Sequence, residues 1–290
     1  MPSLKAIRTR IVSVKNTQKI TRAMKLVAAA RLKRAQDTIV AARPYAKHMG
    51  EVIADVTMRM REEEDSHPLL EQRDIKRVRI IVVTSDRGLA GGFNSNLLRR
   101  VERYIIEESS KYSSIELVVL GRKGREHFKR RKTTIVGEYP GPAADTALVR
   151  ARELAQQATA DFLEGRIDGI FVAFNEFKSA IAQIIRIDQL LPIVPSQLPT
   201  NEGRIDFEYE PSKGDVLSTL VPLYLEVSLY KVMLESIASE FGARMSAMDN
   251  ATKNAKEMIS SLTLVFNRAR QAAITKELME IVGGAEALKG

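Results

Sequence analysis

The residues best placed for small-molecule chemistry in this 290-residue chain lie at 84–94 and read Thr-Ser-Asp-Arg-Gly-Leu-Ala-Gly-Gly-Phe-Asn. They follow a β-branched, apolar run that predicts a buried strand, and they precede a helical pattern. Many proteins bind phosphate at a glycine-rich turn between a strand and a helix. However, the spacing G-x-G-x-x-G is missing, and so is a lysine-bearing phosphate loop. We therefore favour a tight structural turn over a nucleotide site.

Other kinds of chemistry have little support. His48, His67 and His127 are the only histidines, and they lie in different segments without the spacing of metal ligands. The chain contains no cysteine, which excludes a thiol nucleophile, a disulfide and a cysteine-ligated metal. It also lacks the G-x-S-x-G elbow of a serine nucleophile. We therefore expect no catalytic residue, metal ligand or cofactor in this chain.

The segment that must position the turn, residues 75–205, alternates between strand and helix patterns. Strands are expected at 78–84, 116–120 and 170–174, with 180–187 pairing to the last of them as a hairpin. Helices are expected between these strands, at 95–109, from 121 through Arg131, and at 145–163. The alternation predicts a small, Rossmann-like open α/β sheet.

The N-terminal segment, residues 1–62, carries apolar residues at alternating spacings of three and four from Leu4 to Met60. Only Gln18, Thr21 and Lys25 interrupt this stripe. Such a repeat, sustained over eight heptads, is typical of a coiled coil, because it keeps one face of the helix turned toward a partner.

The C-terminal segment, residues 211–290, carries a second stripe from Leu220 to Ala273, with Lys231 as one of its polar members. We expect this helix to be capped between residues 215 and 218 and to end at Gly283-Gly284. Because the two stripes lie at opposite ends of the chain, the economical solution is a long antiparallel coiled coil. The expected fold is thus a paired-helix shaft with the α/β domain inserted between its two helices.

Charge is concentrated in the first segment. Residues 1–60 hold thirteen Lys or Arg against three acidic residues, within a chain of net charge +9. Such a basic stripe suits nucleic acid, an anionic membrane or an acidic protein lining. It has no interleaved aromatic residues, which argues against stacking on single-stranded nucleic acid. Two alternatives thus stay open from the residues alone: a nucleotide-binding α/β protein with helical arms, and a basic coiled-coil protein that binds nucleic acid.

Four stretches make the sequence recognisable. They are residues 11–30 (IVSVKNTQKITRAMKLVAAA), 85–94 (SDRGLAGGFN), 243–255 (ARMSAMDNATKNA) and 266–278 (FNRARQAAITKEL). In this order they resemble the gamma subunit of F-type ATP synthase along the whole chain. The resemblance implies a non-catalytic central rotor shaft, which couples rotation of the membrane c-ring to conformational cycling of the catalytic beta subunits.

The resemblance also implies partners, one copy per complex and contact positions. The shaft would enter a ring of three alpha and three beta subunits, and its globular domain would meet epsilon and the c-ring, which provides its only contact with the membrane. Nucleic acid is not an expected partner. Contacts with beta are implied at Met24, Arg244, Arg270, Gln271, Thr275 and Glu277, and a foot on the c-ring and epsilon at Tyr209 and Glu210.

The implied location is the cytoplasmic face of a bacterial plasma membrane, where the protein would be peripheral. The middle domain has no cysteine, so the thiol switch of the chloroplast form is not available. The apolar residues at 278–285 would be the tip of the shaft in an apolar bearing. The ion that drives rotation, H⁺ or Na⁺, is not encoded here, because ion sites would lie on another subunit.

Overall fold

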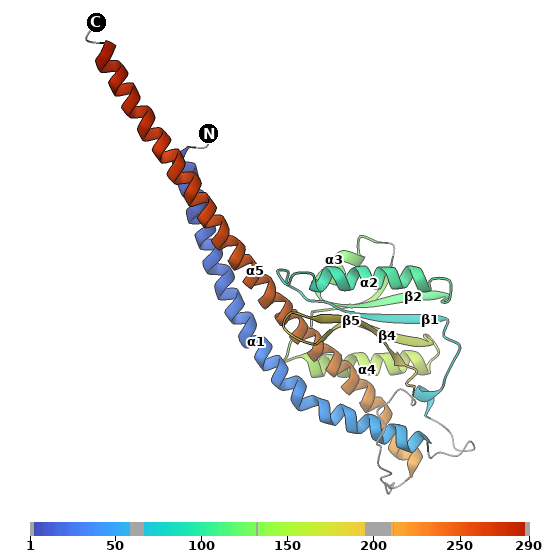
Figure 1. The fold of residues 1–290 in the computed structure, drawn as a ribbon. Coiled ribbons are helices and arrows are strands. Elements are labelled where there is room, and N and C mark those ends of the chain that lie inside the picture. Colours follow the sequence, from blue (N-terminus) through green and yellow to red (C-terminus); the bar gives the residue numbers. More distant parts are fainter. Residues whose placement is uncertain (1–2, 59–66, 132, 195–209, 211, 288–290) are drawn as a thin grey trace. The chain divides into compact units, whose positions relative to one another are not determined.

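The computed structural model describes residues 3–58, 67–131, 133–194, 210 and 212–287 (Figure 1). The elements in chain order are α1 (Leu4–Met58), the short 3-10 helix η1 (Pro68–Leu70), β1 (Arg77–Val83), α2 (Phe93–Glu108), β2 (Ser114–Leu120), α3 (Arg122–Phe128), β3 (Thr134–Tyr139), α4 (Ala147–Leu163), β4 (Gly169–Phe177), β5 (Gln183–Leu191) and α5 (Lys213–Ala287).

Two compact units share these elements. The helical unit comprises Met1–Val27 and Met245–Gly290, and the α/β unit comprises Ala28–Arg244. The units group the chain differently from the three segments expected from the sequence, because α1 and α5 each contribute to both. Tyr209 and most of the linker expected after residue 62 lie outside the described residues.

The α/β unit is built on one five-stranded sheet in the order β3-β2-β1-β4-β5. Strands β1, β2, β3 and β4 run parallel, and β5 pairs antiparallel with β4. The expected open sheet and its closing hairpin are therefore confirmed. The prediction missed β3, whose residues alternate between exposed and half-buried at the sheet edge, so it lacks the apolar run of a central strand.

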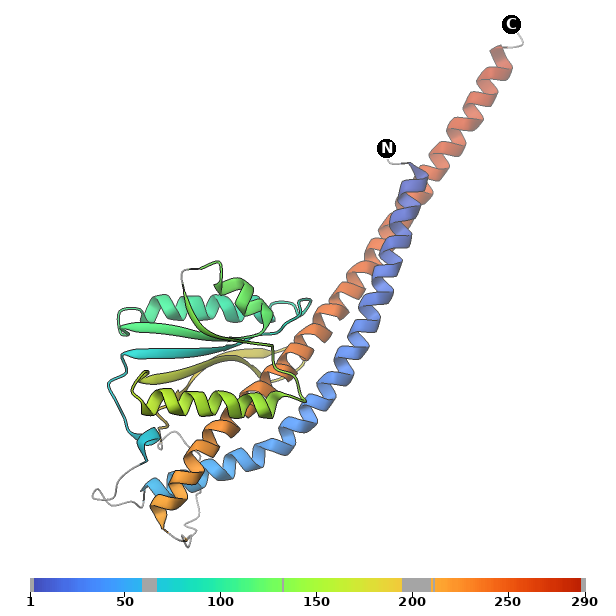
Figure 2. The same ribbon diagram turned by 180° about the vertical axis from the view of Figure 1, so that it is seen from behind.

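Successive side chains of a strand point to opposite faces of the sheet. On one face, Val78, Ile80 and Val82 of β1 pack with Leu97 and the other buried residues of α2. The opposite face is covered by α4 and α5 (Figure 2). The sheet is thus a two-sided core, and α5 forms part of its covering layer.

The tight turns at the carboxyl ends of β1 and β2 lie against one another. Gly121 has a φ of +95°, and a Cβ atom there would lie 2.3 Å from the carbonyl oxygen of Thr84. The hydroxyl of Thr84 donates to the carbonyl of Leu120 and accepts the backbone N–H of Gly124. Only a residue without a side chain fits here, which explains the glycine that the sequence places at this turn.

The predicted stripes are confirmed in the helical unit. Every stripe position from Leu4 to Lys25 is buried or half-buried, and so is every one from Met245 to Ala273. The two helices run antiparallel, because Thr21 contacts Thr252 while Lys25 contacts Asp249 (Figure 1). The stripe is a shared seam between them.

In the part of α5 that lies in the α/β unit, the predicted stripe fails at Lys231, and burial is not confined to the stripe. Lys231, expected in the seam, is exposed, whereas residues 232–239 are all buried. The buried residues before them are Leu217, Val221, Leu225 and Leu229, which follow a different phase. The reason is that the sheet covers this part of α5, so burial is no longer confined to one stripe.

Both expected ends of α5 need correction. The helix begins at Lys213, and the backbone N–H of Asp215 donates to the hydroxyl of Ser212, which therefore serves as the cap. At the other end the helix continues through Gly283 to Ala287. Among the described helices, α5 is the one long and apolar enough to cross a membrane by length and composition, and 33% of its apolar window is buried inside the protein.

The Gly121 turn yields a prediction. Gly121→Ala should destabilise the fold by about 3 kcal/mol, because it adds a steric clash to an unfavourable backbone conformation. Gly165→Ala is the matched control: its φ is +66°, but nothing lies within 4 Å of the added Cβ. The control should cost only about 1–2 kcal/mol. Urea unfolding of both purified variants measures the difference, and equal losses would contradict the clash.

Candidate functional site

The turn that the sequence singled out for chemistry, residues 84–94, is held by hydrogen bonds within the chain. The backbone N–H of Ser85 donates to Oδ1 of Asn94, and Nδ2 of Asn94 donates to the hydroxyl of Ser85. Leu89 adopts a left-handed conformation with a φ of 63°. These contacts support the structural turn that the sequence favoured.

Asp86 occupies the place where an anion would bind. Its Oδ1 accepts the backbone N–H of Arg122, at the start of α3, at 2.8 Å and that of Gly141 at 3.0 Å. A helix N-terminus attracts negative charge, and here the carboxylate of the chain itself supplies it. A phosphate at this helix start would have to displace the carboxylate of Asp86.

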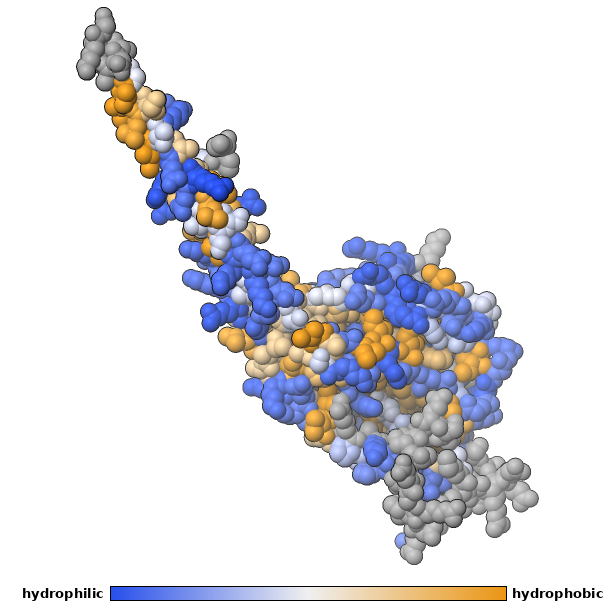
Figure 3. Space-filling model, in the orientation of Figure 1, coloured by the Kyte–Doolittle hydropathy of each residue, from blue (hydrophilic) through white to orange (hydrophobic). Residues whose placement is uncertain are grey.

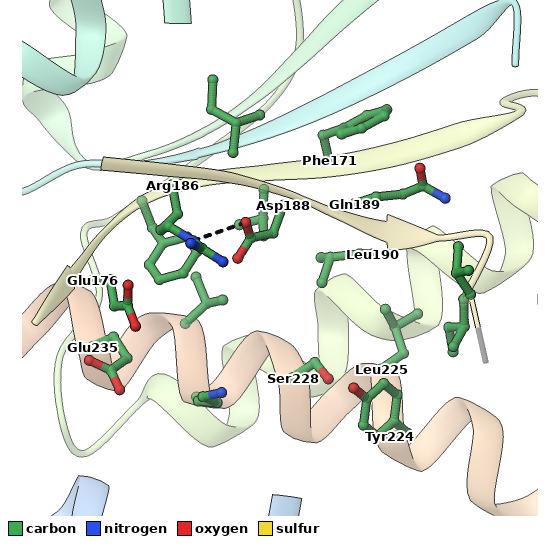
Figure 4. A pocket seen from close by; sticks show the side chains of 17 residues that line it. Phe171, Glu176, Arg186, Asp188, Gln189, Leu190, Tyr224, Leu225, Ser228 and Glu235 are labelled. Atoms are coloured by element: carbon green, nitrogen blue, oxygen red, sulfur yellow. Dashed lines mark ion pairs between the residues drawn. The ribbon is translucent and has the colours of Figure 1, made fainter. Parts of the chain in front are cut away.

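A cavity of about 560 Å³ lies between the sheet and α5. Figure 4 shows Arg186 and Asp188 on β5 and Glu235 on α5 around it. Arg186 pairs with Asp188 at 3.3 Å, and Glu235 accepts the backbone N–H of Phe177 at 3.0 Å. Because these charged groups bind one another or the backbone, they do not converge on the cavity as ligand-binding groups would. Among the described residues, no cluster of three potential metal ligands occurs.

The helical unit contains a polar layer within its apolar seam, formed by Thr21, Lys25, Asp249 and Thr252. The ammonium of Lys25 lies 2.6 Å from Asp249, and the hydroxyls of Thr21 and Thr252 are 2.8 Å apart. Hydrogen bonds from Lys25 and then Lys253 hold the pKa of Asp249 below its ordinary value. Two of the three interruptions in the α1 stripe, Thr21 and Lys25, are therefore matched by polar partners on α5, which is how a helix pair specifies its register.

Met24 lies beside this layer and is half-buried. It is the one residue between 3 and 27 that is not fully exposed although it lies off the stripe. Its position next to Lys25 places a methionine at the edge of the seam.

The last part of α5 extends beyond the start of α1. Continuing the register of Thr21 opposite Thr252 brings Leu4 beside Ala269. The predicted contact residues beyond this point are all exposed on a helix without an α1 partner, namely Arg270, Gln271, Thr275 and Glu277. Apolar side chains gather near its end (Figure 3), including Leu278, Met279, Ile281 and Val282. Such exposed apolar surface is typical of a protein interface.

The other predicted contact residues lie in the α/β unit. Arg244 is buried, and its guanidinium pairs with Glu240 at 2.6 Å. It also donates to the carbonyl of Gly88 at 3.2 Å. Glu210 is exposed. The structure thus places four predicted residues together at the end of α5, and Arg244 elsewhere.

Sequence reasoning missed Glu240, Ser239 and Glu235. The stripe gave no sign of them, because they lie off its expected positions on a part of α5 that is buried on several sides. One signal was available: Gly242 is the only glycine of α5 between Gly214 and Gly283. A Cβ atom at Gly242 would lie 3.3 Å from Ala180 and from Phe177, so this glycine marks a close approach to the β4–β5 turn.

The described residues thus combine an antiparallel helix pair with an α/β unit whose sequence lies between the two helices. Comparison with known proteins supplies the family. A family model described as ATP synthase matches residues 3–288. The ATP synthase gamma chain of Anaeromyxobacter sp. (strain K) is 51% identical over the full length of both chains, and that of Trichlorobacter lovleyi is 50% identical, again over both full lengths. The chain belongs to the ATP synthase gamma chain family.

Solved structures agree with the fold. A chain of the Tetrahymena thermophila mitochondrial ATP synthase central stalk and c-ring is 25% identical, with a TM-score of 0.57, and the match covers 80% of this chain and 99% of that one. A chain of the Euglena gracilis mitochondrial ATP synthase has a TM-score of 0.65 at 18% identity, covering 98% and 94%. The expected fold class and the family resemblance are confirmed.

The polar layer yields a second prediction. Lys25→Asp should lower the melting temperature of the chain, because it places a second carboxylate beside Asp249. Adding Asp249→Lys should restore part of the loss by reversing the pair. Lys33→Asp serves as the control, since Lys33 pairs only with Asp37 on the same exposed helix surface. Thermal unfolding followed by circular dichroism tests this, and an unchanged melting temperature for Lys25→Asp would refute the pairing.

Proposed function

We propose that the chain is the central rotor shaft of a bacterial F-type ATP synthase. It couples rotation of the membrane c-ring to conformational cycling of the catalytic beta subunits during ATP synthesis or hydrolysis. The observation that carries the proposal is the full-length identity of about half to curated gamma chains. The antiparallel helix pair adds physical support, because two long helices that share a seam resist twist and bending better than either alone.

The chain's own residues perform the coupling mechanically rather than chemically. The exposed, basic face of α1 carries Lys5, Arg8, Arg10, Lys15, Lys19 and Arg22. This face suits an acidic lining of the alpha–beta ring. The rotor angle would then decide which beta conformation is favoured, since a partner that binds one state better shifts the population toward it.

The contact set is part of the same proposal. Arg270, Gln271, Thr275 and Glu277 would meet beta subunits near the end of α5, and Met24 would do so beside the polar layer. Arg244 belongs to the set as the member that Glu240 and Gly88 already orient. Residues 278–285 would form the tip in an apolar bearing. Glu210 and Tyr209 would belong to a foot that contacts epsilon and the c-ring. Through the c-ring, the chain would be held at the cytoplasmic face of the plasma membrane.

Purification and deletion test the rotor function. A tagged chain should purify with a hexameric ATPase in one copy per complex, and the isolated chain should hydrolyse no ATP. Membrane vesicles without the chain should lose ATP synthesis driven by an ion gradient, and the restored gene should return it. Synthesis at the wild-type rate without the chain would exclude the proposal.

The contact set has a test of its own. Replacing Gln271 and Thr275 together by Ala should lower ATP synthesis several-fold in complexes that assemble normally, because polar contacts to beta are lost. Glu153→Ala is the control, since Glu153 lies on α4 and pairs only with Arg150 at the surface. If the double variant synthesises ATP as fast as the control, these two positions are not contact points.

A further inference from the structure

One short part of α5, residues 235–244, holds several polar and close contacts with the rest of the α/β unit. Glu235 accepts the backbone N–H of Phe177, and the hydroxyl of Ser239 donates to the carbonyl of Asn175 at 2.9 Å. Gly242 approaches Phe177 and Ala180 closely. The positions 235, 239 and 242 recur at helical spacing, so these contacts share one face of α5 and join it to β4 and the β4–β5 turn.

A second face of the same helix is held by the turn after β1. Arg244 donates to the carbonyl of Gly88, and Ala243 packs in a buried cluster with Ala90 and Phe93. At about 100° per residue, the contacts from Gly242 to Arg244 cover an arc of roughly 200° around the helix. A helix held over half its circumference cannot roll on the sheet, whereas contacts on one face alone would leave that motion open.

Glu240 keeps Arg244 in place. Its carboxylate lies one helical turn before Arg244 and 2.6 Å from the guanidinium, and the two side chains are 13% and 10% exposed. The ring of Phe241 lies 5.6 Å from Arg244 and 5.5 Å from Arg31 of α1. The guanidinium is therefore fixed by a carboxylate, an aromatic ring and a backbone carbonyl that come from two separate elements.

The receiving turn is itself rigid. Asp86 accepts two backbone N–H groups, and Asn94 bonds with Ser85 on both its amide oxygen and nitrogen. In addition, the amide of Asn175 donates to the carbonyl of Phe93, and Asn175 accepts Ser239 through its own carbonyl. The turn and the two faces of α5 therefore belong to one connected hydrogen-bond network.

We propose that Glu240 is a positioning residue that locks Arg244 onto the carbonyl of Gly88, and that this lock makes residues 235–244 the joint through which torque passes between the α/β unit and α5. The inference rests on the proposed rotor function. α5 leaves the joint as a continuous helix, so rolling at the joint would let the α/β unit turn without turning the shaft by the same angle. Loss of the lock should uncouple the two motions partly while leaving ATP hydrolysis on the beta subunits intact.

The test compares ion pumping with ATP hydrolysis by the assembled complex in vesicles. Glu240→Ala should lower the number of ions pumped per ATP at least twofold, while hydrolysis stays within twofold of wild type. Glu240→Gln should keep most of the pumping, since its amide oxygen still accepts from Arg244. Arg244→Lys should also lower the number of ions pumped per ATP, because the shorter side chain does not carry its ammonium to the place of Nη2, the atom through which Arg244 contacts both Glu240 and Gly88. Glu153→Ala is the matched control and should not change the ratio.

A cross-link separates the joint from direct contact of Arg244 with beta. The chain has no native cysteine, so Cys at Ala90 and Ala243, which pack in one buried cluster, can be joined by oxidation to a disulfide in the Glu240→Ala background. If residues 235–244 act as the joint, linking the turn to α5 should restore the number of ions pumped per ATP, although the contact between Glu240 and Arg244 is still missing. If cross-linking leaves the ratio low, or if Glu240→Ala assembles and pumps like wild type, the joint is refuted.

Two further outcomes are informative. If Glu240→Ala fails to assemble, Arg244→Lys decides the question by the same ratio. If a complete complex with the wild-type chain does not pump ions, the rotor function is refuted. If the wild type pumps and the Glu240→Ala variant pumps equally well, only the joint is refuted.

Discussion

The structure depends on one constraint: a helix as long as α1 cannot bury its own apolar stripe. Its 55 residues present one continuous face, and burial of that face needs a partner of similar length. The chain supplies the partner from its other end, more than 200 residues away in sequence. The α/β unit accordingly lies between the two paired segments in sequence, as an insertion.

The polar layer refines this constraint. An uninterrupted apolar seam allows two helices to slide by one heptad at little cost, because each register buries similar side chains. The Thr21–Thr252 and Lys25–Asp249 contacts exist in one register only. Their value is therefore specificity more than stability, since partly exposed ion pairs contribute little to the free energy of folding. A shaft that converts angle into conformation needs this fixed register.

Much of the fold could be predicted from the sequence, and the failures have physical causes. Seam periodicity is a local property, so it gave both helices and their partnership in the helical unit. The periodicity failed at Lys231, because the sheet determines which residues of α5 are buried there. The spacing of apolar residues along a helix does not show where a sheet will pack against it. Strand β3 escaped notice because an edge strand has no apolar run, and Ser212 because the cap lies outside the periodic pattern.

The candidate site, too, was predicted in part and missed in part. Recognition of motifs pointed to Arg270, Gln271, Thr275 and Glu277, and the structure places all four on exposed helix surface. It could not foresee that Arg244 binds the carbonyl of Gly88, because that contact joins residues 156 positions apart. Single residues that bond across such distances carry no periodic or compositional signal.

The carboxylate of Asp86 has a consequence for how the α/β unit is held together. Related sheet architectures commonly bind a nucleotide at the carboxyl ends of their strands, where the ligand bridges several loops. Here the side chain of Asp86, in the turn after β1, bridges the backbone at the start of α3 and the backbone at Gly141 after β3. The loops that follow three neighbouring strands are therefore tied together by a group of the chain itself.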